Sequence, residues 1–260
     1  MAYSNEFVIL QRMKLIFLGT GTSTGIPQIA CKCKVCTSVD IRDKRLRASV
    51  LITNNQHSIL VDCGPDFRQQ MLKHNIDNLK SIVITHEHYD HIGGIDDVRP
   101  YGNVQIYAEK RVNTQIMQSM PYCFKENPYP GVPKLTLNNI DNNPFNIDGI
   151  AIQPIRIMHA KLPIYGYRFG NLAYLTDVKT LDEVAYEQLK DLDVLILNAL
   201  RVQTHIAHIT LDEAIVIAKK IGAKKTYFTH FSHDLGLHAE VESSLPSGIF
   251  LSYDNLELEF

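Results

Sequence analysis

Residues 85–91, Thr-His-Glu-His-Tyr-Asp-His, gather histidine and aspartate side chains that are suited to binding metal ions. They follow an apolar run at 82–84, which predicts a buried strand, so we expect them on the loop that leaves a sheet edge. Because side chains alternate in an extended segment, three of them should leave the backbone on one side: His86, His88 and Asp90. His91 is out of that phase and fits a turn that reaches a second ion. Imidazole and carboxylate ligands together favour zinc, manganese, iron or a similar divalent ion.

Three further candidates each come just after a predicted strand: His159, Asp177 and His230. Their shared placement would let them converge on the edge that carries residues 85–91. We expect one ion to be bound by His86, His88 and His159. We expect a second ion to be bound by Asp90, His91 and His230. The two carboxylate oxygens of Asp177 can bridge both ions. Two ions about 3.5–4 Å apart can share a hydroxide and neutralise charge that develops on a phosphoryl group.

The rest of the chain must bring these groups to one edge. Apolar runs predict strands at 14–18, 49–52, 58–61, 82–84, 104–107, 150–157, 166–169, 172–175, 194–197, 225–228 and 256–258. Helices are predicted between Pro65 and His74 and at 109–120, 181–189 and 210–221. The last begins with a capping box of Thr210 and Glu213. Prolines and asparagines predict an irregular excursion at 121–146.

The composition is that of an ordinary globular protein, because 45% of the 260 residues are hydrophobic and 21% are charged. The formal net charge of -2 argues against a protein that coats nucleic acid. No apolar stretch approaches the roughly 20 residues of a membrane span. We expect a single α/β domain at 13–260 after an N-terminal extension at 1–12. Arg12 and Lys14 interrupt the apolar N-terminal region, so no export signal is expected and the predicted location is cytoplasmic.

The ligand series and its strand context resemble the metallo-β-lactamase superfamily from about Lys14 to the C-terminus. The His-x-His-x-Asp-His element at 86–91 carries most of this resemblance. The resemblance implies a four-layer αβ/βα sandwich with a metal site at the sheet edges. It also implies that Asp90 serves as a ligand, as a catalytic group that orients the reactants, or as both.

Three of the five cysteines lie within six positions and far along the chain from the histidine-rich segment: Cys31, Cys33 and Cys36. The lysines between them favour the thiolate form, and three soft ligands need a fourth to close a tetrahedral zinc site. We expect His233 to be that ligand, because an odd step from His230 in an extended chain points it the opposite way. Reduced free thiols are the alternative. The clustering favours a reducing cytoplasm over a disulfide framework.

Further motifs narrow the resemblance to the PhnP-type phosphodiesterases: Gly19-Thr20-Gly21, Gly25-Ile26-Pro27, the cysteine cluster and Thr229-His230-Phe231-Ser232-His233. Those enzymes hydrolyse phosphoribosyl 1,2-cyclic phosphate with a dinuclear site and carry a structural zinc. The resemblance therefore implies two catalytic divalent ions (zinc, manganese or nickel), one structural zinc and a homodimer. PQQ biosynthesis protein B has a similar cysteine cluster, so these motifs do not fix the substrate.

The PhnP-type resemblance also implies a general-acid histidine before the helix at 210–221. The spacing to the Thr-His-x-Ser-His segment matches His208, which only Ile209 separates from the capping box, and His205 is the fallback. A histidine with a near-neutral pKa suits this role. We therefore expect a phosphodiesterase that acts on a small cyclic or nucleotide-like phosphodiester, with neither a membrane nor a nucleic acid as partner. A tRNase Z-like endonuclease, a hydrolase like PQQ biosynthesis protein B and a non-catalytic metal-stabilised protein are the alternatives.

Overall fold

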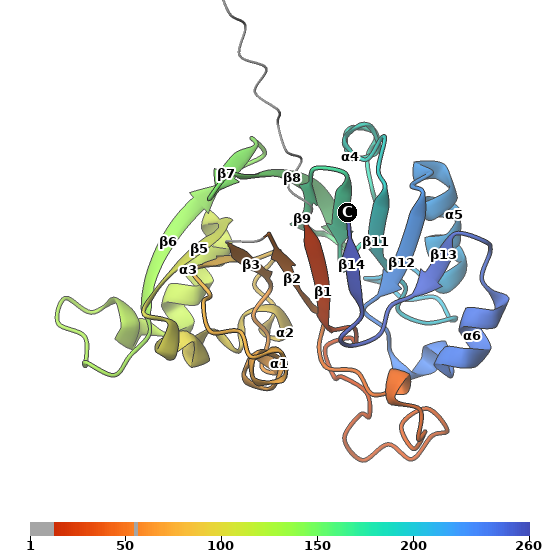
Figure 1. The fold of residues 1–260 in the computed structure, drawn as a ribbon, viewed down its shortest axis with the longest axis horizontal. Helices are drawn as coiled ribbons and strands as arrows, with labels where there is room; N and C mark the ends of the chain where they lie inside the picture. Colours follow the sequence, from red (N-terminus) through yellow and green to blue (C-terminus); the bar gives the residue numbers. More distant parts are fainter. Residues whose placement is uncertain (1–12, 55–56) are drawn as a thin grey trace, which may run out of the picture.

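Short apolar runs form two seven-stranded sheets that face each other (Figure 1). The computed structural model describes residues 13–54 and 57–260. The first sheet has the order β14-β1-β2-β3-β4-β5-β6 and the second has the order β13-β12-β11-β10-β9-β8-β7. The extension predicted at 1–12 lies outside the described residues.

The strands of the first sheet are β1 (Lys14–Gly19), β2 (Ser49–Thr53), β3 (Ser58–Val61), β4 (Ser81–Val83), β5 (Asn103–Glu109), β6 (Lys134–Ile140) and β14 (Glu257–Glu259). Those of the second are β7 (Phe145–Ile147), β8 (Ile150–His159), β9 (Leu162–Phe169), β10 (Leu172–Leu175), β11 (Val194–Asn198), β12 (Lys225–Thr229) and β13 (Ile249–Leu251).

The α-helices are α1 (Phe67–His74), α2 (Tyr89–Ile92), α3 (Lys110–Ser119), α4 (Glu183–Gln188), α5 (Leu211–Ile221) and α6 (His238–Ser244). Short 3-10 helices are η1 (Ile41–Asp43), η2 (Ile95–Tyr101), η3 (Pro121–Phe124) and η4 (His233–Leu235). Within the described ranges, no helix combines the length and the apolar character needed to cross a membrane.

Strand side chains alternate between two hydrophobic layers, which makes the molecule a sandwich. In β1, Leu15 and Phe17 pack between the sheets, whereas Ile16 and Leu18 face the outer layer that holds α1 and α3. In β11, Ile196 lies between the sheets and Leu197 packs in the outer layer of α4, α5 and α6. This alternation is what a strand buried on both faces requires. The predicted four-layer αβ/βα sandwich is confirmed, as one domain.

One predicted segment is partly wrong. Residues 125–133 and 141–144 are irregular as expected, but the rest of the excursion predicted at 121–146 forms η3, the edge strand β6 and the beginning of the short strand β7. β6 pairs in parallel with β5 along its whole length. Its sequence, Lys-Leu-Thr-Leu-Asn-Asn-Ile, is polar because it is an edge strand, and Leu135 and Leu137 pack on the outer core. All the prolines that suggested irregularity lie outside the two strands, and Pro133 and Pro144 directly precede them.

Parallel pairing brings several strand ends to the same edges. β3, β4, β5 and β6 run parallel in the first sheet, and β10, β11, β12 and β13 run parallel in the second. β8 also runs in the direction of β10, because both are antiparallel to β9. The loops that leave β4, β8, β10 and β12 can therefore meet at one edge of the sandwich.

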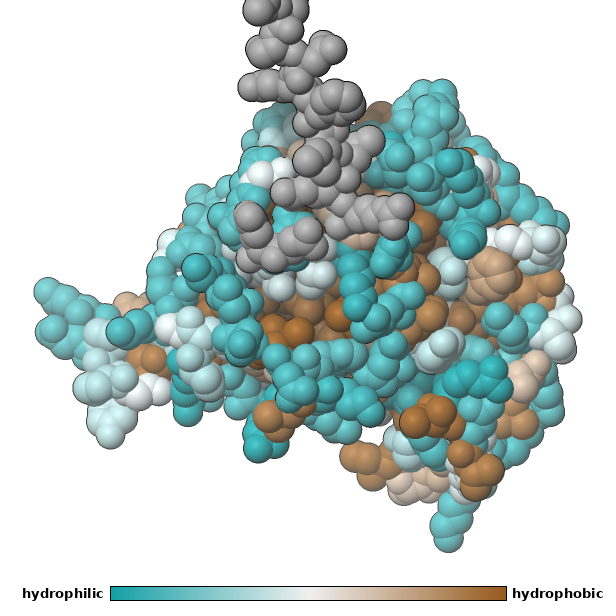
Figure 2. Space-filling view, in the orientation of Figure 1, coloured by the Kyte–Doolittle hydropathy of each residue, from teal (hydrophilic) through white to brown (hydrophobic). Residues whose placement is uncertain are grey.

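The surface in Figure 2 is largely hydrophilic. Hydrophobic side chains gather along its lower edge, where Figure 1 draws the loop between β1 and β2. That loop exposes Ile29, Val39 and Ile41. It also carries the cysteine cluster.

Candidate metal centre

The loop after β4 changes conformation at His88. His88 is extended, with φ -63° and ψ 148°, and caps the single turn of α2. The expected extended alternation therefore stops at His88, and the expectation that Asp90 shares a face with His86 and His88 is wrong. The helical turn carries Asp90 and His91 towards a second group of side chains instead.

His86, His88 and His159 form the first cluster, with one ligand atom of each within 4.8 Å of the others. His86 Nε2 lies 3.0 Å from His88 Nδ1. The other ring nitrogens of His86 and His159 contact oxygen atoms of the surrounding protein. His86 Nδ1 lies 3.0 Å from Thr85 Oγ1, and His159 Nδ1 lies 3.0 Å from the carbonyl oxygen of Asp177. Such contacts fix the ring orientation of metal-binding histidines.

Asp90, His91 and His230 form the second cluster at the same spacing. His91 Nε2 lies 3.2 Å from a carboxylate oxygen of Asp90 and 3.3 Å from Oδ2 of Asp177. The other oxygen of Asp177, Oδ1, lies 3.4 Å from His230 Nε2. Asp177 also falls in a group with His86 and His91, so its carboxylate stands between the clusters.

Left-handed turns aim two of these side chains inward. Asp177 has φ 60° and His230 has φ 59°, although neither is glycine. This conformation is uncommon for such residues and concentrates at functional sites. Both turns directly follow parallel strands, so the sheet fixes where each turn begins.

The clustered groups fit divalent metal ions. Among the buried side chains of the described residues, His91 Nε2 and both ring nitrogens of His230 have no hydrogen-bond partner. Buried polar atoms without partners are destabilising, and a bound cation would accept the lone pair of His91 Nε2 and that of one ring nitrogen of His230. Burial also lowers the pKa of His86 well below its ordinary value, which keeps a lone pair available.

The charges around the second cluster also favour a bound cation. Burial tends to lower the pKa of His91, but the carboxylates of Asp62, Asp90 and Asp177 outweigh it and raise this pKa well above its ordinary value. Burial tends to raise the pKa of Asp90, but the charge on His91 outweighs it and holds this pKa well below its usual range. The carboxylates of Asp62, Asp90 and Asp177 therefore stabilise a positive charge at this position.

Asp62 is a residue of this site that we did not single out from the sequence. It is fully buried after β3, and its carboxylate accepts a hydrogen bond from His91 Nδ1 at 2.7 Å and from the Thr85 backbone N–H at 2.8 Å. Asp62 also follows a strand, so the placement that indicated His159, Asp177 and His230 applies to it as well.

His208 lies beside the clusters and His205 is further out. The ring of His208 is 4.7 Å from that of His159, and its Nδ1 is 3.7 Å from Asp177 Oδ1. Burial lowers the pKa of His208 to about 3. The ring of His205 lies 5.0 Å from His208, and His205 Nδ1 accepts a hydrogen bond from the Ala207 backbone N–H. His159, Asp177 and His208 also stand at ligand spacing, so His208 has two roles open to it.

The three clustered cysteines meet the fourth predicted ligand. His233 Nδ1 lies 3.2 Å from the Sγ of Cys31 and 3.4 Å from those of Cys33 and Cys36. A backbone hydrogen bond from Cys36 lowers the pKa of Cys33 to about 6. Four soft and borderline ligands without an open position are typical of a structural zinc site. His233 begins η4, so the turn at His230, not an extended chain, separates the two histidines.

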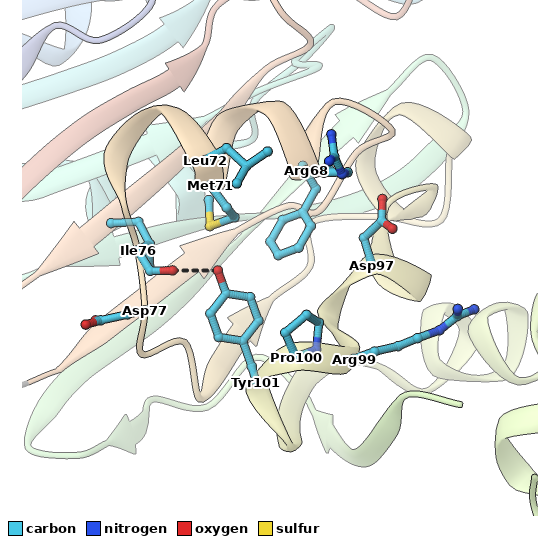
Figure 3. A pocket seen from close by; sticks show the side chains of 10 residues that line it. Arg68, Met71, Leu72, Ile76, Asp77, Asp97, Arg99, Pro100 and Tyr101 are labelled. Carbon is cyan, nitrogen blue, oxygen red and sulfur yellow. Dashed lines mark hydrogen bonds between the residues drawn. The ribbon is translucent and has the colours of Figure 1, made fainter. Parts of the chain in front are cut away.

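A cavity of about 420 Å³ lies apart from these clusters, between α1 and η2 (Figure 3). Its walls include Phe67 and Met71, and Arg68 and Asp97 stand at one side. None of the clustered ligands lines it, so this cavity is not part of the candidate centre.

The chain belongs to the β-lactamase superfamily, because the model of the beta-lactamase superfamily domain matches residues 57–231. A crystal structure described as a new diphosphatase from the PhnP family is 40% identical, with a TM-score of 0.90 over 95% of this chain and 98% of that one. The predicted resemblance to the superfamily and to PhnP-type proteins is thereby confirmed. Zn(2+)-bound PqqB from Methylobacterium extorquens has a TM-score of 0.77 at 17% identity, over 95% of this chain and all of that one, which shows the fold alone.

Two curated relatives carry different names. A protein of Porphyromonas gingivalis named octanoyltransferase is 43% identical over 251 residues, which cover 94% of this chain and 51% of that protein. Coenzyme PQQ synthesis protein B of Xanthomonas campestris is 26% identical over 157 residues, covering 53% of this chain and 52% of that protein. The matches thus span about half the length of these relatives.

Proposed function

We propose that this protein is a metal-dependent hydrolase that cleaves a small phosphodiester or diphosphate. The observation that carries the proposal is the meeting of seven histidine and aspartate side chains in two adjoining clusters that share Asp177. The similarity to a PhnP-family diphosphatase over nearly the whole chain supports the same chemistry.

Each cluster would hold one divalent ion. His86, His88 and His159 would bind the first, Asp90, His91 and His230 the second, and Asp177 both. When bound, such a pair supplies positive charge for a phosphoryl group and lowers the pKa of water at the site. Zinc, manganese and nickel suit this mixture of imidazole and carboxylate ligands. The cysteine cluster would hold a structural zinc.

We propose that His208 is the general acid, which donates a proton to the leaving group. Burial lowers the pKa of His208 in the free protein, and the carboxylate of Asp177, whose Oδ1 lies 3.7 Å from His208 Nδ1, opposes this fall. A protonated His208 would donate to the oxygen of the departing group. This donation matters for an alkoxide, which is strongly basic, and matters little for phosphate leaving from a diphosphate.

Two observations argue against an RNA substrate like that of tRNase Z. The formal net charge is -2. The interval between His159 and Asp177 is filled by β9 and β10, which leaves no room there for an RNA-binding arm. The human short-form tRNase Z shares only 20% identity at a TM-score of 0.66, over 94% of this chain and 98% of that one, which shows the fold alone.

The proposal is tested by measuring hydrolysis with manganese or zinc added. The substrates are bis(p-nitrophenyl) phosphate, phosphoribosyl 1,2-cyclic phosphate, a nucleotide diphosphate, a pre-tRNA and an octanoyl thioester. We expect turnover of a phosphodiester or diphosphate that Asp177→Asn abolishes and His57→Ala retains, because His57 lies outside both clusters. Cleavage of the thioester or the pre-tRNA alone would refute the proposal. The homodimer implied by the PhnP-type resemblance is tested by light scattering on the same preparation.

A further inference from the structure

Asn198 ends β11, between the two strands whose loops carry Asp177 and His230. Leu197 is in register with Leu175 of β10, and Asn198 is in register with Thr229 of β12. The side chain of Asn198 is fully buried. It belongs to none of the clustered ligand groups.

The carboxamide of Asn198 forms hydrogen bonds with both the backbone N–H and the backbone carbonyl group of Val178. Its Oδ1 accepts from the Val178 N–H at 2.7 Å, and its Nδ2 donates to the Val178 carbonyl oxygen at 3.2 Å. Val178 directly follows Asp177, which has φ 60°. A non-glycine residue keeps this conformation only where surrounding contacts fix it. Asn198 supplies two such contacts.

The same backbone residue also reaches the loop of His208. The Val178 carbonyl oxygen accepts a second hydrogen bond, from the Ile209 N–H at 3.1 Å. His159 Nδ1 lies 3.0 Å from the carbonyl oxygens of both Asp177 and Ala207, which ties the two loops together again. A shift of Val178 would therefore disturb Asp177 and His208 together.

We propose that Asn198 is a positioning residue that holds the carboxylate of Asp177 where two ions can share it. This inference rests on the proposed function. An amide side chain is required because it both donates and accepts. Aspartate at this position cannot donate to the Val178 carbonyl and adds negative charge behind Asp177. Alanine leaves the buried Val178 N–H without its partner and leaves the Val178 carbonyl oxygen with only the Ile209 N–H.

The test compares Asn198→Asp and Asn198→Ala with Asn113→Ala as the control. Asn113 is also buried, its amide donates to the backbone carbonyls of Ala108 and Asn138, and it belongs to none of the clustered ligand groups. The readouts are manganese affinity by chelator competition, the electron paramagnetic resonance signal of a coupled manganese pair, and kcat against KM. We expect both Asn198 variants to bind the second ion roughly 10- to 100-fold more weakly. Both Asn198 variants should lose the coupled signal, and their kcat should fall by a larger factor than their KM changes. Asn113→Ala should change none of these quantities.

Variants of Asn198 that retain the coupled signal and the affinity would overturn the inference and leave the proposed function intact. A wild-type chain that never shows a coupled pair would contradict both together. If the variants do not fold, hydrogen exchange of the wild-type chain after chelation decides. The Val178 amide should then stay protected, and exchange as fast as that of exposed loop amides would overturn the inference.

Discussion

His91 shows how a single contact can orient a candidate metal ligand. Its Nδ1 donates to Asp62, and this leaves Nε2 to face Asp90 and Asp177. Burial raises the pKa of Asp62, and the charge on His91 opposes this rise. A carboxylate behind an imidazole fixes the ring and increases its basicity, as in many metal sites.

Asp62→Asn should therefore weaken metal binding without unfolding the chain. The amide keeps the size of the side chain but removes the charge behind His91, and we expect an affinity loss of roughly 10- to 100-fold. Competition with a fluorescent chelator measures this loss. Asp97→Asn, at the exposed Asp97 beside the separate cavity, is the control. Equal affinities for the two variants would show that Asp62 does not support the site.

His208→Ala should separate substrates by their leaving groups. Without a proton donor, turnover of an alkyl phosphodiester should fall about 100-fold or more, because general acid catalysis typically contributes this much. A p-nitrophenyl diester has a weakly basic leaving group, so its turnover should stay within about tenfold of wild type. Steady-state kinetics on both substrates measure the difference. Equal losses would assign His208 to ligation or structure instead.

At the scale of elements, α6 is joined to the loop between β1 and β2 by a buried histidine. His238 Nδ1 accepts a hydrogen bond from Arg45 at 2.9 Å, and the His238 backbone N–H donates to Asp43. The acceptor role requires a neutral ring. Burial and the nearby charge of Arg45 accordingly lower the pKa of His238 to about 4.

This pKa predicts an acid-sensitive contribution to stability. As pH falls below about 6.5, the unfolded state binds a proton at His238 before the folded state does, so stability is lost between about pH 6.5 and 4. His238→Gln retains an acceptor but does not titrate. We expect its melting temperature to fall less than that of wild type over this range, by calorimetry at matched metal content. Parallel pH profiles would refute the role of His238.

Some helices and strands have a clear signal in the local sequence, and others do not. The helix predicted at 210–221 is confirmed because its ends are encoded locally. Thr210 and Glu213 form the capping box, and Gly222 ends the helix with φ 72°. β6 was missed because an edge strand carries polar residues on its open side. α6 was missed because its seven residues give little periodicity.

At the scale of the whole molecule, the site depends on contacts between the two sheets. Tyr167 of β9 is buried between them, and its hydroxyl donates to the carbonyl oxygen of Ile84 at 2.6 Å. The Tyr165 backbone N–H donates to the Thr85 carbonyl oxygen at 3.2 Å. Both contacts reach the segment just before His86, so the second sheet positions the ligand loop of the first.

Tyr167→Phe should cost about 1 kcal/mol of unfolding free energy, because it removes a buried hydrogen bond. Tyr174 is the matched control. It is equally buried in β10, but its hydroxyl is among the buried polar atoms of the described residues that have no hydrogen-bond partner. Tyr174→Phe should be neutral or slightly stabilising. Urea unfolding measures both, and equal destabilisation would contradict the role of the Ile84 contact.

The sequence predicts which candidate ligands come together better than it predicts the residues that position them. Placement after strands was enough to select His159, Asp177 and His230, because parallel strands end at one edge. The role of Asn198 could not be predicted in this way. It depends on the left-handed turn at Asp177 and on the direction of a single peptide group, and neither has a signature in the local sequence.

The most direct measurement is anomalous X-ray diffraction from crystals grown with excess manganese or zinc. We predict two adjacent peaks about 3.5–4 Å apart, one at each histidine cluster, with the carboxylate of Asp177 between them. A third peak is expected among Cys31, Cys33, Cys36 and His233 when zinc is present. Absence of signal at both histidine clusters, with their imidazoles turned away from one another, would contradict a shared metal centre.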